Sequence, residues 1–430
     1  MAVLALLKIF KDPTWGIVGV FTALPLEPFM PQFGGITLGR LIGVLAILSW
    51  FFNYYKFEKY RLSIKNSPIV NRVAFFGIAI VVSSSFWLFE LGGETAMAND
   101  ITVLLLCLFA IMVQSIVTSN TQVAKIGFGL VFASSIACIP GFLFTYGYDV
   151  YSFFGAEAPK DLTEESLRAT NIGGSANELG IIARNGIYGG LIFLLFNKNK
   201  KVQIVNLVLL FICLAGLFLS GSRTNFFGVG ILVAVALIVM LIKLKGNLTK
   251  FILPTIIGAV LLSFVWSLAP ALIKERLFLG QKNERIAERV KDRQQFVVDQ
   301  RQQSLDYLFE YPFTGIGLNR TNQMTGGYGA HDSFSVIVGE TGLIGIFAFL
   351  FLTVFSMFFI IKQILYQQDV SKIVPLGFLL GSFLSVIIMG VGVGLVLIYD
   401  RTFYLTIGLI TPISTGLLIS EHLKKTKGIN

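Results

Sequence analysis

The sequence predicts an all-α polytopic membrane protein with about twelve transmembrane helices. Hydrophobic side chains make up 55% of the 430 residues and charged side chains only 13%, with a mean hydropathy of +0.77. These values lie well outside the range of soluble globular proteins. Apolar runs of about 20 residues, the length that crosses a bilayer as a helix, recur along the whole chain. Every second connection between these runs contains a short cluster of basic residues.

The apolar runs give the approximate limits of the predicted spans. The first contains Pro25 and Pro28, so we expect it to be broken or re-entrant, and counts of about eleven to thirteen spans are compatible with the pattern. The predicted spans are 13–30, 39–55, 70–90, 100–118, 124–145, 174–196, 203–220, 224–243, 250–268, 332–361, 374–398 and 402–420.

The orientation follows from lysine and arginine beside the span ends, because basic loops stay in the cytoplasm. We therefore expect both termini to be cytoplasmic. Two long connections, 146–173 and 270–330, then lie on the outer face. The larger loop joins the ninth and tenth spans within a single membrane domain, 1–430, and holds most of the polar sequence complexity. The basic residues are Lys8 and Lys11; Lys56, Lys59, Arg61, Lys65 and Arg72; Lys125; Lys198, Lys200 and Lys201; Lys243, Lys245 and Lys250; Lys362 and Lys372; and Lys424, Lys425 and Lys427.

Several classes of function are disfavoured by composition and motifs. The net charge of +10 is spread over short clusters, which indicates topology and not a nucleic-acid surface. Cys107, Cys138 and Cys213 lie inside apolar runs and are expected to be packing residues. The predicted outer face has no Asp-x-Asp, His-rich or Glu-x-x-His motif for a metal, and the chain has no Gly-x-x-x-x-Gly-Lys nucleotide loop. We therefore expect neither a metal nor a cofactor.

His331, one of only two histidines, lies where the large outer loop enters the next apolar run. A histidine at a membrane boundary is often only an interfacial polar residue. Here ten residues separate His331 from Gly342, and small residues at 339, 342 and 345 are predicted to line one helix face and permit close packing.

These residues resemble the signature of O-antigen ligases and polymerases. The resemblance is carried by His331, the ten-residue spacer and the Gly-x-x-Gly that follows, with Asp332 where the family usually has asparagine. The other matching segments are Tyr311-Pro312-Phe313-Thr314-Gly315-Ile316-Gly317, the Ser-Arg turn Leu219-Ser220-Gly221-Ser222-Arg223, and the helix start Gly174-Ser175-Ala176-Asn177-Glu178-Leu179-Gly180.

The resemblance implies a GT-C-like enzyme of the bacterial inner membrane with its active site on the periplasmic face. Such an enzyme transfers a glycan from polyprenyl diphosphate to an acceptor sugar hydroxyl in surface polysaccharide or lipopolysaccharide biosynthesis. His331 would be the catalytic base. The implied partners are the lipid-linked donor, a glycolipid or glycan acceptor and membrane lipids, but no nucleic acid.

Arginines near the hydrocarbon give a separate physical argument, since inserting one costs about 2.5–3.5 kcal/mol. Arg223 is placed in a tight outer turn, Arg184 within a predicted span, and Arg401 at another outer end. A diphosphate would offset this cost through bidentate contacts. Structural pairs, Glu178 with Arg184 and Asp400 with Arg401, are the alternative. We interpret Arg184 as structural and Arg223 as substrate-binding, and keep Arg401 as a candidate.

The outer loop adds further basic candidates. Arg285, Arg289 and Arg293 recur every four residues and form one stripe if the segment is helical. Such a stripe is either a solvated charged face or a contact for lipid diphosphate or anionic headgroups. The family carries a loop arginine before Gly-x-Gly, and the spacing fits Arg293 and Arg301 equally. Arg289, Arg293 and Arg301 therefore remain candidates.

Within the superfamily, the ten-residue spacing resembles ligases more than polymerases, and both alternatives stay open. A lipid-oligosaccharide flippase or transporter would also have about a dozen spans. Transporters commonly place ionisable groups near mid-bilayer and contain repeated halves. Here the polar groups collect near the predicted outer edge and no repeat is visible. A non-catalytic partner in polysaccharide assembly is a third alternative.

Overall fold

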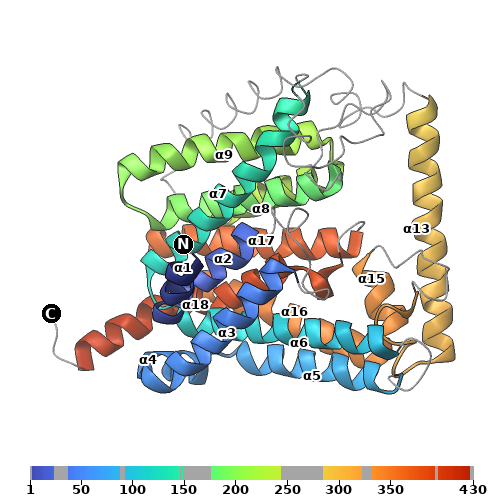
Figure 1. Cartoon of the computed structure of the whole chain (residues 1–430), viewed down its shortest axis with the longest axis horizontal. Coiled ribbons are helices and arrows are strands. Elements are labelled where there is room, and N and C mark those ends of the chain that lie inside the picture. Colours follow the sequence, from blue (N-terminus) through green and yellow to red (C-terminus); the bar gives the residue numbers. More distant parts are fainter. Residues whose placement is uncertain are drawn as a thin grey trace. The chain divides into compact units, whose positions relative to one another are not determined.

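The computed structural model describes residues 2–23, 37–87, 93–145, 148, 176–243, 284–321, 332–392 and 396–426 (Figure 1). Within these ranges the regular elements are all helices, with no strand. The prediction of an all-α polytopic membrane protein is therefore confirmed at the level of fold class.

In the described ranges, 8 helices are long and apolar enough to cross a membrane. A bent pair, α4 Glu58–Lys65 and α5 Val70–Ser85, meets at 75° and raises this number to 9 if the pair is one span. The predicted count of twelve is not confirmed. The candidate spans are Leu38–Lys56, Met97–Ile116, Asn120–Leu143, Ala176–Phe196, Lys200–Ser220, Arg223–Lys243, Gly342–Tyr366 and Lys372–Val391.

Several predicted spans differ from the structure or fall outside it. In the first, α2 is Thr14–Ala23, whose 10 residues are too short to cross the bilayer, and residues 24–36 lie outside the described ranges. The predicted span 70–90 is the shorter helix α5 after the bend at α4. The predicted span 250–268 also lies outside the described residues.

The predicted start of the span 332–361 is wrong, because the helix is interrupted before Gly342. Asp332 is followed by a one-turn helix, α15 Ser333–Ser335, and by a π-helix, η3 Val336–Glu340. The long helix α16 begins at Gly342, whose φ of 59° is left-handed and ends a right-handed helix. Residues 339, 342 and 345 therefore do not line one face of a continuous helix.

One compact unit contains residues 1–52, 119–287 and 368–378. Its central helix α7, Asn120–Thr145, packs against α8, Ala176–Phe196, and α9, Lys200–Ser220. The other helices of this unit are α1 Ala2–Lys11, α2, most of α3 Leu38–Lys56, α10 Arg223–Lys243, and the beginning of α17 Val370–Gly392.

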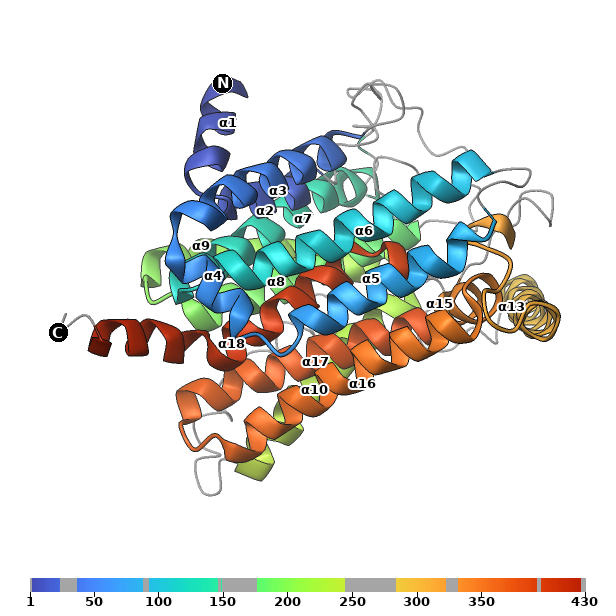
Figure 2. The ribbon, with the colours of Figure 1, turned by 90° about the horizontal axis from the view of Figure 1, so that it is seen from below.

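The second unit contains residues 53–118, 288–367 and 379–430. Helix α5 lies between α6, Gly93–Ile116, and α16, Gly342–Tyr366, and the three run side by side in Figure 2. Helix α18, Arg401–Thr426, packs on α6. The remaining elements are α4, α13 Glu284–Glu310, α15, η3, the rest of α17, and the 3-10 turn η4 Leu397–Tyr399.

The spans carry apolar side chains on their outer surfaces as well as inside. On α16, Phe347 is 64% and Phe358 66% exposed, and on α9, Ile204 is 64% exposed. In water such surfaces would be unfavourable, whereas a bilayer solvates them. The exposure pattern agrees with several membrane spans.

The prediction that the cysteines are packing residues is confirmed. All three are buried and free. A Cβ added at Gly186 would meet the sulfur of Cys213, and one added at Gly216 would meet the sulfur of Cys138. These thiols therefore fill the space that glycines on neighbouring helices leave open.

The closest approach of α7 and α8 depends on Gly127 and Gly189. A Cβ at Gly189 would lie 2.4 Å from Leu130 Cβ and 2.7 Å from the carbonyl oxygen of Gly127. We predict that Gly189→Ala lowers the stability of the protein by roughly 1–3 kcal/mol, because the added carbon forces two backbones apart. The measurement is the midpoint of thermal unfolding in detergent.

Gly230→Ala is the matched control, because a Cβ at this position in α10 would have nothing within 4 Å. Alanine also favours helices more than glycine does. We expect its midpoint to equal or slightly exceed that of the unmodified protein. Equal midpoints for the two variants would contradict the importance of this helix contact.

Candidate functional site

The segment that contains the loop arginines is helical, which is the condition under which their four-residue spacing forms one stripe. Helix α13 runs from Glu284 to Glu310, so Arg289, Arg293 and Arg301 all belong to it. The side chains of Arg289 and Arg293 lie outside the described part of the structure. The side chain of Arg301 is described and contacts residues from two other segments.

The Gly-x-Gly segment, residues 311–317, pairs through its backbone with the segment around the Gly-x-x-Gly motif. The two motifs that carried the family resemblance are therefore two sides of one structure, which we call the glycine junction: residues 311–317 and 339–344. Its backbone hydrogen bonds run from Ile316 N to Gly339 O (3.0 Å), Gly317 N to Glu340 O (2.9 Å), Leu343 N to Pro312 O (2.8 Å) and Ile344 N to Phe313 O (3.2 Å).

Two glycines make the glycine junction possible. Gly315 has a φ of 61° and Gly342 a φ of 59°, conformations that other residues adopt only with strain. A Cβ at Gly315 would lie 2.5 Å from the carbonyl oxygen of Gly339. A Cβ at Gly342 would lie 2.5 Å from the nitrogen of Gly315. Each glycine leaves room for the backbone of the opposite segment.

The end of α5 braces the glycine junction. The Ser83 hydroxyl donates to the carbonyl oxygens of Thr314 (2.7 Å) and Thr341 (2.8 Å), one on each side. The Trp87 ring nitrogen donates to Gly315 O at 3.0 Å. The Trp87 ring also contacts the edge of Tyr311 and lies 4.7 Å from the guanidinium carbon of Arg320. The junction therefore has a defined position on the helix bundle of its own unit.

Asp332, which follows His331, is fixed by two contacts. Its Oδ1 accepts a hydrogen bond from Ser335 N at 2.7 Å and caps α15. Its Oδ2 pairs with Arg301 Nε at 3.0 Å, and Arg301 Nη2 donates to Val391 O at 2.6 Å. Asp332 is 2% exposed. Asparagine would also cap this turn, but only a carboxylate balances the charge of Arg301.

His331 itself lies outside the described residues. Its catalytic assignment therefore stays a prediction. What the structure adds is the environment of its neighbour, because the Asp332 carboxylate is held by Arg301 of α13.

Glu340 lies buried at the last position of the π-helix, a kind of helix that is frequent at functional sites. Its Oε2 accepts a hydrogen bond from Asn319 N at 2.8 Å, and Asn319 has a left-handed φ of 62°. Burial raises the pKa of Glu340 to about 7. Burial also raises the pKa of Tyr399, with a smaller contribution from the charge of Glu340.

In the other unit, the Ser-Arg turn packs against the start of α8. Helix α9 ends at Ser220, Gly221 adopts a φ of 57°, and α10 begins at Arg223. The Asn225 Nδ2 donates to Ser222 Oγ at 2.9 Å. A Cβ at Gly180 would lie 2.7 Å from Ser222 Cβ and 2.8 Å from Asn225 Nδ2.

Arg223 is half-buried in this turn. Its guanidinium makes no hydrogen bond, ion pair or ring contact with the rest of the described chain. A half-buried guanidinium in this state is able to take an anion as ligand, and the substrate-binding role of Arg223 stays a prediction.

A family model described as O-antigen ligase matches residues 208–350. The match runs from α9 into α16 and contains the Ser-Arg turn, α13 and the whole glycine junction. Residues 208–350 are thus similar to O-antigen ligases. The similarity supports the O-antigen ligase and polymerase superfamily and a ligase- or polymerase-type role in O-antigen biosynthesis. A search of curated proteins gave no match.

The other arginines, Arg184 and Arg401, differ in their surroundings. Arg184 is completely buried, donates from Nη2 to Asn185 Oδ1 at 3.2 Å, and lies 5.7 Å from the Tyr188 ring. These contacts agree with a structural role. Arg401 begins α18 after Asp400, whose Oδ1 accepts from Thr402 N at 2.6 Å.

Sequence reasoning about the site missed Ser83, Trp87 and Glu340. Glu340 had a readable signal, because it is a carboxylate in an apolar run between two motif glycines. Ser83 and Trp87 had none, because more than 200 residues separate them from the segments that they contact.

The raised pKa of Glu340 predicts a pH-dependent stability. Between pH of about 4.5 and 7 the unfolded chain releases this proton before the folded chain does, so the contribution of Glu340 to stability falls as pH rises. Glu340→Gln keeps an oxygen acceptor for Asn319 N but does not titrate. We expect the variant to gain thermal stability relative to the unmodified protein on going from pH 5 to pH 8.

The measurement is the difference in unfolding midpoint between variant and unmodified protein across this pH range. Glu310→Gln is the matched control, since Glu310 is exposed at the end of α13. It accounts for the effect of removing an exposed carboxyl group. If the difference for Glu340→Gln followed that of the control at every pH, the raised pKa of Glu340 would be refuted.

Proposed function

We propose that this protein transfers a glycan from a polyprenyl-diphosphate donor to a sugar hydroxyl of an acceptor, at the outer face of the bacterial inner membrane. The main support is that the family motifs form packed structures in both units. In one unit, the Ser-Arg turn contains the partly buried Arg223. In the other, Arg301 holds Asp332, the residue next to His331.

Arg223 would bind the diphosphate of the donor. As the anomeric carbon–oxygen bond breaks, negative charge grows on the departing diphosphate, and a planar guanidinium stabilises it through paired hydrogen bonds. The half-buried position strengthens this interaction because water screens it less. Arg401 is a further candidate for the same chemistry.

His331 would act as the general base. The acceptor hydroxyl oxygen forms a bond with the anomeric carbon, the bond to the diphosphate oxygen breaks, and the hydroxyl proton passes to His331. A single displacement inverts the anomeric centre. Since a sugar hydroxyl is too weak an acid to ionise beforehand, proton transfer must accompany the attack.

Arg301 differs from the other loop arginines in this proposal. Its Nε and Nη2 already donate to Asp332 and Val391, so its first role is to orient the segment that follows His331. Arg289 and Arg293 then remain the loop candidates for the donor phosphates. Arginines, and no metal ion, would supply the electrostatic stabilisation.

A ligase is our first choice within the superfamily, because the ten-residue spacing after His331 resembles ligases. A polymerase of the same superfamily would use the same chemistry with the next repeat unit as acceptor. The rival from another class, a lipid-oligosaccharide flippase, needs no base and no charge stabilisation at a leaving group.

The first experiment compares surface glycolipids of the host after deletion of the gene with those after complementation. We predict that His331→Ala fails to restore the profile, whereas His422→Ala restores it and serves as the matched control with the only other histidine. Both variants must reach normal protein levels in the membrane.

The profile also distinguishes the alternatives. Long chains on the polyprenyl carrier with a bare acceptor would indicate a ligase, and single repeats on the acceptor a polymerase. An unchanged profile on deletion, or full restoration by His331→Ala, would contradict the proposed function.

For Arg223 we predict a loss of transfer with little change in folding. Arg223→Gln removes the charge and the paired donors, and should lower the transfer rate by about 100-fold or more. Arg223→Lys keeps the charge and should retain an intermediate rate. The measurement is the initial rate with lipid-linked donor in proteoliposomes. Arg61→Gln, on the exposed side of α4, is the control; if Arg223→Gln matched its rate, the assignment would be refuted.

A further inference from the structure

Two lysines from different helices converge on one tryptophan ring in the first unit. Lys8 Nζ of α1 and Lys125 Nζ of α7 each lie 5.4 Å from the centroid of the Trp15 ring. Both ammonium groups are close enough for a cation–π interaction with this indole. Two like charges have thus been brought to the same side chain.

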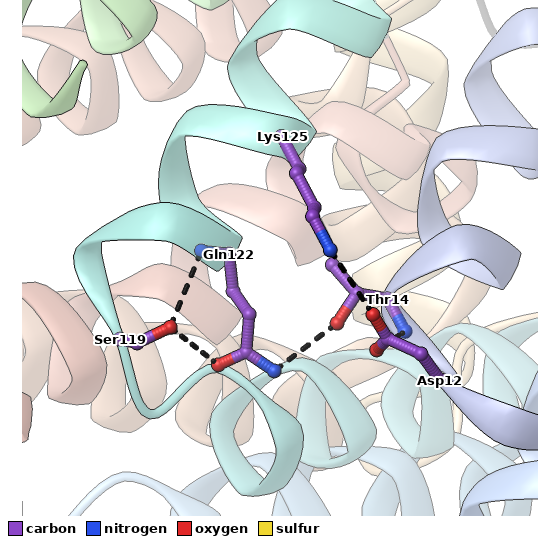
Figure 3. A network of polar contacts seen from close by, with 5 residues as sticks. All are labelled: Asp12, Thr14, Ser119, Gln122 and Lys125. Carbon is purple, nitrogen blue, oxygen red and sulfur yellow. Dashed lines mark hydrogen bonds and ion pairs between the residues drawn. The ribbon is translucent and has the colours of Figure 1, made fainter. Parts of the chain in front are cut away.

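Contacts where α1 meets α2, at residues 11–15, position these side chains; we call this segment the joint. Asp12 Oδ1 accepts a hydrogen bond from Thr14 N at 3.1 Å, and its Oδ2 pairs with Lys125 Nζ at 3.3 Å. Gln122 Nε2 donates to Thr14 Oγ1 at 3.2 Å, and its Oε1 accepts from Ser119 (Figure 3). The first turns of α7 therefore hold Trp15 and Lys125 in place.

Positive charge remains in excess at this joint. Asp12 pairs with Lys125, while Lys8 has no carboxylate within ion-pair distance in the described ranges. Lys11, at the end of α1, adds another exposed ammonium group. A bound anion would offset the repulsion between these charges.

The joint also lies beside the start of a candidate membrane span. Lys125 is on the second turn of the span Asn120–Leu143, less than about 10 Å from its start. Trp15 is 39% and Leu7 60% exposed, while Ile9 on the opposite face of α1 is buried. Tryptophan and lysine beside exposed apolar side chains are typical of residues at the lipid headgroups.

We propose that Lys8, Lys125 and Trp15 form a binding site for the headgroup of an acidic phospholipid. The phosphate would pair with the ammonium groups of Lys8 and Lys125 beside Trp15, and the glycerol and acyl chains would extend along Trp15 and Leu7. This occupant satisfies the excess charge and the exposed apolar surface together, which neither a free phosphate nor a neutral lipid does. The site is independent of glycan transfer.

The test measures lipid binding to the full-length protein by native mass spectrometry, with dioleoyl phosphatidylglycerol and dioleoyl phosphatidylcholine added in turn. We expect a preference for phosphatidylglycerol. Lys8→Gln should weaken that lipid's binding by about fivefold, and the double variant with Lys125→Gln further. Lys8→Gln breaks no ion pair in the described structure and leaves the pair of Asp12 with Lys125 in place.

The matched control is the double change Lys200→Gln and Lys201→Gln. These exposed lysines begin α9 and contact no aromatic ring within the described residues. The control should keep the full preference, and so should Lys8→Arg. Equal binding of the two lipids, equal loss in the control, or complete competition by inorganic phosphate would each overturn the proposal.

Discussion

The backbone contact between Gly315 and Gly342 sets the geometry of the second unit's site. At each position a single added carbon would lie 2.5 Å from opposing backbone atoms, so only glycine allows the two segments to meet. The consequences extend in both directions along the chain. One segment leads to Asn319, which Glu340 holds, and the other follows Asp332, which Arg301 holds. The family match, residues 208–350, contains all of these groups.

The fold class was predictable because the bilayer imposes it. Runs of about 20 apolar residues have few solutions other than helices, since backbone polar groups must be paired inside each segment. The helix ends were less predictable. Hydropathy records which side chains are apolar, but it does not record that Gly342 has a φ of 59° or that α4 and α5 meet at 75°. Both features depend on neighbouring segments that a local pattern does not contain.

The residues of the candidate site were predictable from the sequence where they belong to a family motif. The resemblance identified Gly315, Gly342 and Arg223 as members of separate motifs. It did not predict that the Gly-x-Gly and Gly-x-x-Gly segments pair with each other. The spacing left Arg293 and Arg301 as equal alternatives, and the structure shows that Arg301 contacts Asp332. The side chains of Arg289 and Arg293 lie outside the described residues. Contacts such as that of Ser83 with Thr314 join residues 231 positions apart, a distance at which periodicity carries no information.

The arginines of this protein differ in whether the protein itself supplies an acceptor for the guanidinium group. Arg301 meets the carboxylate of Asp332, and Arg184 meets the side-chain oxygen of Asn185, so both guanidinium groups have protein acceptors. Arg223 has none in the described chain although it is half-buried. A guanidinium at the centre of a membrane helix costs about 2.5–3.5 kcal/mol on insertion scales, and Arg223, at the first residue of α10, would carry only part of that cost. An anionic ligand at this turn would offset it, and a lipid diphosphate would bring its charge from within the bilayer itself.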